Sequence, residues 1–219
     1  MQQDLFEQPS GNESSKRSDD TLETLYLDPE KASILYLYRN FLDADRSGEL
    51  FHTLEKDIPW RQDQIRIAGK QMRIPRLQAW FGDTNARYGY SGIVLDPIPF
   101  SPTLLQIKSA IESTCNNRFN SLLANYYRDG QDSVSWHADD EPELGINPTI
   151  ASLSLGQTRR FSLKHKRDKS YDTLFLDLHP GDLLIMAGET QHHWLHQVAK
   201  TKKVSEPRIN LTFRKIDVK

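Results

Sequence analysis

The stretch Arg208-Ile-Asn-Leu-Thr-Phe-Arg214 alternates polar and apolar side chains along its whole length. A period of two is typical of a β-strand whose two faces meet different surroundings. Inward-facing polar groups are costly unless an anion binds them, and a guanidinium offers a carboxylate two parallel hydrogen bonds. The alternative to an anion-binding strand is an exposed strand whose polar face forms a few ion pairs. One face would carry Arg208, Asn210, Thr212 and Arg214, and the other Ile209, Leu211 and Phe213.

Short strands of the same kind precede this stretch, separated by turn signals such as Asp129-Gly130. Regular short strands indicate a sandwich or a jelly-roll barrel. The spacing of apolar residues predicts helices at residues 31–42 and 102–115, and a hairpin at residues 64–76, so the fold class is α+β. We expect the strands at residues 121–127, 149–156, 160–165, 174–178, 183–187, 194–198 and 210–213.

The bulk properties describe a globular chain of 219 residues with a net charge of −2 and a single cysteine, Cys115. One cysteine excludes an internal disulfide and a cysteine-cluster zinc site, and it fits a reducing compartment. No apolar run approaches the roughly 18 residues of a membrane span, and residues 1–10 lack the apolar segment of a secretory signal. Because the net charge is −2, a nucleic-acid partner would have to bind to local basic patches.

His137 and Asp139 lie two residues apart on a segment that we expect to be extended, so both side chains face the same side. With one more histidine they would form a face of two histidines and one carboxylate, which leaves positions open on an iron(II) ion. In a strand, alternation excludes His193 as the third ligand but does not choose between His192 and His196. The alternative is an accidental pair in a solvated acidic loop.

Several segments in a fixed order resemble the AlkB family of iron- and 2-oxoglutarate-dependent nucleic-acid dealkylases. The resemblance covers about residues 60–216. It rests on Pro75-Arg-Leu-Gln-Ala-Trp-Phe-Gly-Asp83, Tyr88-Gly-Tyr-Ser91, Asn125-Tyr-Tyr127, Trp136-His-Ala-Asp-Asp-Glu141, Ile150-Ala-Ser-Leu-Ser-Leu-Gly156, Trp194-Leu-His196 and Arg208-Ile-Asn-Leu-Thr-Phe-Arg214.

The resemblance implies a double-stranded β-helix, or jelly-roll, core that uses iron(II), 2-oxoglutarate and oxygen. It implies His137, Asp139 and His196 as iron ligands, because the Trp-x-His pattern selects His196. With Arg214, which would lie near the carboxylate that is lost, these are the expected catalytic residues. The 2-oxoglutarate site would be lined by Asn125, Tyr127, Arg208, Asn210, Thr212 and Arg214. The damaged base would lie near Tyr88, Tyr90, Ser91, Asp140 and Glu141, and the hairpin tip that supports a flipped base would be Ala68, Gly69 and Lys70.

The implied reaction demethylates 1-methyladenine or 3-methylcytosine in DNA, with RNA as a further candidate, and releases formaldehyde, succinate and carbon dioxide. Both bases are cationic near neutral pH, so a carboxylate such as Asp140 or Glu141 would favour them. Because Ala68 replaces a bulky aromatic residue at the hairpin tip, we expect single strands to serve at least as well as duplexes. Rival interpretations are a 2-oxoglutarate hydroxylase acting on modified tRNA or a protein side chain, a jelly-roll interaction protein without activity, and a hydrolytic zinc enzyme.

The implied organisation has three parts. Residues 1–22 would be a flexible polar tail, residues 23–100 an N-terminal helix plus a nucleotide-recognition lid, and residues 101–219 a helix and the jelly-roll catalytic core. We expect a monomer without membrane contact that acts on nucleic acid in the cytoplasm, or in the nucleus of a eukaryote.

Overall fold

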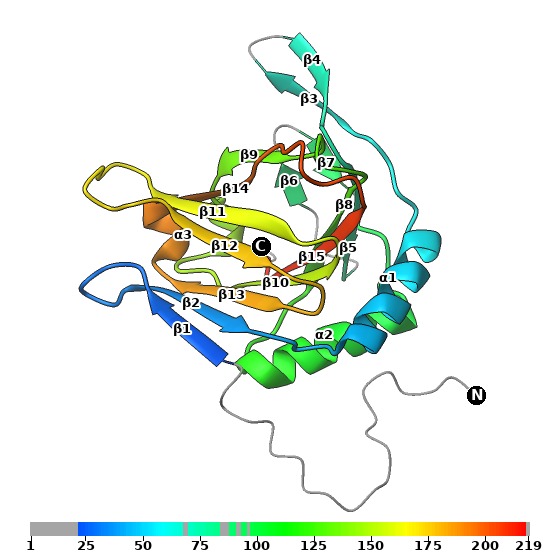
Figure 1. Ribbon diagram of the computed structural model, residues 1–219, viewed down its shortest axis with the longest axis horizontal. Coiled ribbons are helices and arrows are strands. Elements are labelled where there is room, and N and C mark those ends of the chain that lie inside the picture. Colours follow the sequence, from blue (N-terminus) through cyan, green and yellow to red (C-terminus); the bar gives the residue numbers. More distant parts are fainter. Residues whose placement is uncertain (1–21, 68–69, 84–87, 91–92, 96, 218–219) are drawn as a thin grey trace, which may run out of the picture.

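The computed structural model describes residues 22–67, 70–83, 88–90, 93–95 and 97–217. Two antiparallel sheets form its layers (Figure 1). The larger sheet has seven strands in the order β1 (Leu22–Tyr26), β2 (Ser33–Tyr38), β13 (Leu183–Gly188), β10 (Ile150–Gly156), β15 (Arg208–Arg214), β8 (Ser121–Tyr127) and β5 (Leu77–Gly82). The smaller sheet has four strands in the order β12 (Leu174–Leu178), β11 (Arg159–His165), β14 (Trp194–Val198) and β9 (Val134–His137). This is the jelly-roll core expected from the sequence.

Apolar side chains fill the space between the two sheets and also cover the outer face of the larger one. Leu184 and Met186 of β13 belong to the inner cluster, together with Phe161 and Leu163 of β11. On the outer face, two helices pack against the middle strands: α1 (Ala44–Asp57) and α2 (Pro102–Cys115). The helices therefore leave the interior between the sheets to the strands, where a site can form.

Helix α2 is confirmed with the ends that the sequence predicts. Ser101 caps it, because its hydroxyl accepts a hydrogen bond from the backbone N–H of Leu104 at 3.3 Å. Pro102 occupies the first turn, where it has no N–H to lose. Leu104, Ile107 and Ile111 lie three and four residues apart and are fully buried against the sheet.

The helix predicted at residues 31–42 is wrong, because β2 (Ser33–Tyr38) occupies its centre. Leu35 and Leu37 are completely buried in the inner cluster, while Tyr36 and Tyr38 pack against the outer one. A strand that is covered on both faces is apolar throughout, so its pattern can be mistaken for that of a helix. The helix of this region, α1, begins directly after Asp43, whose carboxylate accepts from the backbone N–H of Arg46.

Each strand expected from residue 121 onward is present, and its ends differ from the prediction by two residues at most. The hairpin at residues 64–76 is also confirmed: β3 (Gln64–Ile67) pairs with β4 (Lys70–Arg73) and projects from the rest of the chain (Figure 1). A second small hairpin joins β6 (Tyr88–Tyr90) and β7 (Ile93–Leu95). The remaining elements are a 3-10 turn at Pro142–Leu144 and the short helix α3 (Thr190–His193). No helix in the described part of the chain is long and apolar enough to cross a membrane.

Candidate active site

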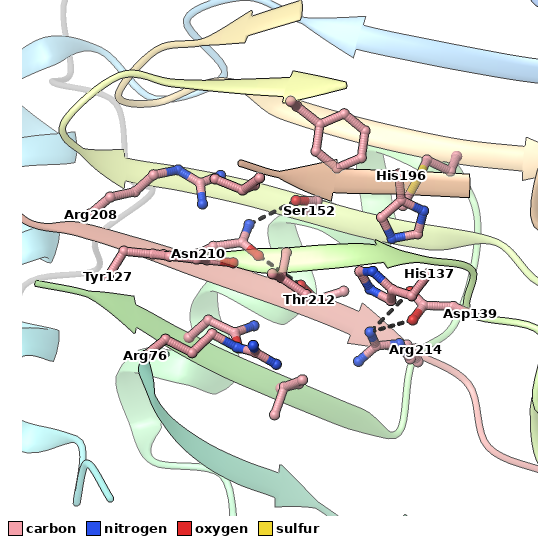
Figure 2. A pocket seen from close by; sticks show the side chains of 16 residues that line it. Arg76, Tyr127, His137, Asp139, Ser152, His196, Arg208, Asn210, Thr212 and Arg214 are labelled. Atoms are coloured by element: carbon pink, nitrogen blue, oxygen red, sulfur yellow. Dashed lines mark hydrogen bonds and ion pairs between the residues drawn. The ribbon is translucent and has the colours of Figure 1, made fainter. Parts of the chain in front are cut away.

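A polar pocket lies between the sheets, where β15 and β8 of the larger sheet face β9 and β14 of the smaller one (Figure 2). Because adjacent strands alternate their side chains in step, each contributes every second residue to the pocket. Its lining includes Arg76, Asn125, Tyr127, His137, Asp139, Ser152, His196, Arg208, Asn210, Thr212 and Arg214.

The three expected metal ligands meet at one end of this pocket. His137 of β9 lies opposite His196 of β14 in the strand pairing, and Asp139 follows two residues after His137. Each offers one ligand atom, and these atoms all lie within 4.8 Å of one another. A two-histidine, one-carboxylate face of this kind suits a divalent iron and leaves coordination positions open.

The structure also separates His196 from the other two candidates. His192 and His193 lie in α3, and only His196 lies in β14. The premise of one continuous strand from residue 192 to residue 196 is therefore wrong, because a helical turn precedes β14. His192 instead accepts a hydrogen bond from the backbone N–H of Asn147 through Nε2 at 3.3 Å, and His193 pairs with Glu189 at 3.1 Å.

The surroundings of the two histidines of the triad suit metal binding. His137 Nδ1 lies 2.8 Å from the carbonyl oxygen of Ser135. A carbonyl only accepts, so Nδ1 carries a proton, and Nε2 is the ring nitrogen that would bind a metal. Burial, reinforced by the neighbouring His137, lowers the pKa of His196 to about 3, so its imidazole is neutral at physiological pH. Neutral imidazoles are the form that binds metals.

The carboxylate of Asp139 is only 1 % exposed and lies against a cation. Arg214 Nη2 donates to both of its oxygens, at 2.8 and 2.9 Å. Burial alone would raise the pKa of Asp139, but the charge and hydrogen bonds of Arg214 outweigh it, and the pKa falls to about 2. Asp139 is therefore ionised, as a metal ligand must be.

The polar face of β15 points into the pocket as predicted, but its four side chains differ in what they bind. Asn210 donates to Ser152 Oγ at 2.7 Å and accepts from the Thr212 hydroxyl at 2.9 Å. The expectation that all four groups require an anion is thus too broad, because serines of β10 satisfy part of this face. Arg208 is different: Nη2 donates to Ser154 Oγ at 2.9 Å, while Nε and Nη1 are buried without a hydrogen-bond partner among the described residues.

The environment of Arg208 suits an anionic ligand. It is 2 % exposed, and burial lowers its pKa to about 10, which leaves it a cation at neutral pH. Its guanidinium carbon lies 5.3 Å from the ring centre of Tyr127, on which Arg159 also lies, at 5.6 Å. The unused N–H groups of a buried cation are the donors that a bound carboxylate would satisfy.

The sequence suggests Arg76 as one of the basic hairpin residues that could track phosphates, but it is 5 % exposed and lines the pocket, a place that sequence reasoning missed. Its Nε donates to Asn125 Oδ1 at 2.7 Å and its Nη1 to the carbonyl of Ser133 at 3.3 Å. Asn125 therefore faces the pocket as expected, but its oxygen is already occupied. Arg76 precedes β5, in a segment quoted for its family resemblance, and no periodicity marks it as buried.

The residues expected near the base are described only in part. Ala68, Gly69 and Ser91 lie outside the described residues, while Lys70 begins β4 and Tyr88 and Tyr90 belong to β6. Asp140 is exposed and forms an ion pair with Lys166, with Nζ and Oδ2 2.6 Å apart. Glu141 is partly buried at the entrance to the 3-10 turn.

Comparisons with known proteins agree with this geometry. Residues 34–214 match the 2OG-Fe(II) oxygenase superfamily. The alpha-ketoglutarate-dependent dioxygenase alkB homolog 3 of Mus musculus is 42 % identical over 198 residues, which are 87 % of this chain and 68 % of that protein. The DNA oxidative demethylase ALKBH2 of Homo sapiens is 40 % identical over 179 residues, which are 78 % of this chain and 69 % of that protein.

Solved structures show the same fold at lower identity. OsALKBH1 superposes with a TM-score of 0.61 and 20 % identity, over 88 % of this chain and all of that chain. A prolyl hydroxylase from Trichoplax adhaerens, solved with a peptide fragment, gives a TM-score of 0.55 and 13 % identity, over 84 % of this chain and 83 % of that one. From the superfamily match and the alkB-named relatives, the chain belongs to the AlkB family of 2OG-Fe(II) oxygenases, enzymes that use iron(II), 2-oxoglutarate and oxygen.

Proposed function

We propose that this chain oxidatively demethylates N-methylated bases, 1-methyladenine and 3-methylcytosine, in nucleic acid. One observation carries the proposal: a single buried pocket holds a metal triad at one end and the spare donors of Arg208 along the same wall (Figure 2). The names of its relatives, which include a DNA oxidative demethylase, support nucleic acid as the substrate. DNA is the first candidate, and RNA is the second.

The residues present fit iron(II) and 2-oxoglutarate. His137, Asp139 and His196 would hold the metal. Arg208 has buried donors without a hydrogen-bond partner in the part of the chain that the structure describes, so it would bind the carboxylate of 2-oxoglutarate that is farther from the metal. When bound, iron supplies the oxygen chemistry that couples oxidation of 2-oxoglutarate to succinate and carbon dioxide with hydroxylation of the methyl group. The hydroxymethyl product then breaks its carbon–nitrogen bond, which releases formaldehyde and the unmodified base.

The protein's own contribution is orientation and charge. Arg214 keeps the Asp139 carboxylate ionised. Asn210 donates to Ser152 and accepts from the Thr212 hydroxyl, so these two side chains of the pocket wall are oriented before the ligands bind. Asp140 and Glu141 directly follow Asp139 in the chain and would place carboxylates near a cationic methylated base. A neutral base would gain nothing from these charges, so they would favour the damaged form.

The nucleic acid would meet the chain on the side of the projecting hairpin. The β3–β4 hairpin carries Arg66, Lys70 and Arg73 and stands away from the rest of the structure (Figure 1). Basic side chains there would track phosphates. We further propose a monomer that works in the cytoplasm or, in a eukaryote, the nucleus, which fits its single free cysteine, Cys115.

The test is reconstitution without oxygen, with iron(II) and 2-oxoglutarate, followed by air and short oligonucleotides. Each oligonucleotide carries one 1-methyladenine or 3-methylcytosine, as a single strand or a duplex, and mass spectrometry reads the loss of the methyl group. His137→Ala should abolish demethylation, and the matched His192→Ala should retain it, because His192 lies in α3 outside the triad. Turnover of 2-oxoglutarate without demethylation would overturn the base-repair proposal and leave the oxygenase.

A further inference from the structure

The three metal-binding groups are not fixed in the same way. His137 and His196 face each other on paired strands, so the sheet itself sets their separation. Asp139 lies beyond the end of β9 and has no place in this ladder. A contact outside the sheet must therefore hold its backbone.

That contact is the side chain of Gln191. The backbone N–H of Asp139 donates to Gln191 Oε1 at 2.9 Å, and Asp139 and Gln191 are 1 % and 0 % exposed. The Gln191 amide nitrogen lies 3.4 Å from the sulfur of Met186, which fixes the orientation of the amide. Arg214 donates to the Asp139 carboxylate, whereas Gln191 accepts from the Asp139 backbone N–H, so Gln191 contacts a different part of the residue from the group that would bind metal.

Gln191 is itself anchored from two sides. On one side is Thr190, the residue before Gln191. Its hydroxyl donates to the carbonyl of Ala187 at 2.6 Å and accepts from the backbone N–H of Ile34 at 3.1 Å. On the other side, Lys166 Nζ donates to the Gln191 carbonyl at 2.8 Å and forms the ion pair with Asp140 at 2.6 Å. The segment that carries Asp139 and Asp140 is thus fastened to α3 at two points.

Helix α3 runs directly into β14, the strand that carries His196. A buried glutamine at this place therefore joins two ligands that otherwise lie on separate elements. Groups that contact ligands without touching the metal commonly set its affinity, because they fix where the ligand atoms point. We propose that Gln191 is the positioning residue for Asp139, with Lys166 as its anchor, an inference that rests on the metal site of the proposed function.

The experiment measures cobalt(II) binding to the metal-free full chain by calorimetry and by the visible spectrum of the bound ion. Gln191→Met keeps the length of the side chain and removes its acceptor, so we expect cobalt(II) affinity to fall about tenfold with a changed spectrum. Lys166→Met should lower affinity about threefold, and Lys166→Arg, which keeps the charge and the donors, should restore it. Gln78→Met is the matched control, since Gln78 is 3 % exposed but does not line the pocket.

The outcomes separate this inference from the proposal that it rests on. If the unmodified chain binds no cobalt(II), or if His137→Ala binds it equally well, the metal site itself is wrong. If the unmodified chain binds but Gln191→Met matches it in affinity and spectrum, Gln191 is only a core residue. Should Gln191→Met fail to fold, Lys166→Met decides: affinity equal to that of the unmodified chain overturns the inference, and a loss that Lys166→Arg rescues supports it.

Discussion

The two faces of β15 are buried to nearly the same extent but meet opposite surroundings. Ile209, Leu211 and Phe213 are 0 % exposed in an apolar cluster beneath the helices. On the other face Arg208, Asn210, Thr212 and Arg214 are between 2 % and 7 % exposed in the pocket. The first face stabilises the fold through apolar burial, whereas on the second Arg208 keeps buried donors that a bound anion would satisfy. Within its seven residues, β15 therefore has one face that stabilises the fold and another that is available to bind a ligand.

The largest effect should come from the apolar face. Leu211→Ala leaves a cavity at a completely buried position, so we expect the free energy of unfolding to fall by about 3 kcal/mol. Chemical denaturation of the metal-free chain measures this loss. Calorimetry should show that affinity for 2-oxoglutarate in the manganese(II) form changes less than about twofold, because the side chain points away from the pocket. A large loss of affinity at unchanged stability would refute the division between the two faces.

The next effect separates binding from stability. Arg208→Met removes the donors without partners, so we expect affinity for 2-oxoglutarate to fall about 100-fold in the manganese(II) form. The free energy of unfolding of the ligand-free chain should stay the same or rise, because a buried charge with unused donors is lost. Calorimetry and denaturation measure the two quantities on the same variant.

Arg159 provides the matched control for this variant, because it lies against the same Tyr127 ring with its donors in use. It donates to the carbonyls of Asp129, Asp132 and Ala199 at 2.9 to 3.0 Å. Arg159→Met should therefore destabilise the chain and leave affinity for 2-oxoglutarate nearly unchanged. Equal behaviour of the two arginine variants would show that Arg208 is a structural residue.

The contrast on β15 was predictable from the sequence, and its partners were not. Alternation over Arg208-Ile-Asn-Leu-Thr-Phe-Arg214 fixes which side chains share a face, because the period of a strand is local. It does not show that Ser152 and Ser154 of β10 already satisfy part of the polar face. Those contacts depend on the pairing of distant strands, so the requirement for an anion was assigned to four residues, whereas Arg208 has spare donors.

The metal site shows the same limit. The pair His137 and Asp139 was found from spacing alone, but His196 was chosen over His192 by family resemblance, because alternation assumed a strand where α3 lies. Nothing in the sequence marks Gln191 as buried beside the metal site, because a glutamine in a polar segment has the pattern of a surface residue. The error at residues 31–42 has a related cause, because a strand covered on both faces loses its alternation.

The smallest effect uses pH to distinguish the apolar face of β15 from the pocket, which His196 of β14 lines. The folded chain holds the pKa of His196 at about 3, below the 6.5 of an unperturbed histidine, so the stability that its neutral form contributes is complete above pH 6.5. As the pH falls from 6.5 toward 3, His196 becomes protonated in the unfolded chain but stays neutral in the folded chain, so the folded state loses stability. At pH 5 the metal-free chain should have lost about 2 kcal/mol relative to pH 7.5 from this group. Leu211→Ala should lower the whole pH profile of unfolding free energy evenly, whereas His196→Leu should flatten it between pH 7.5 and 5. Parallel profiles for the two variants would show that His196 is as readily protonated in the folded chain as in the unfolded one.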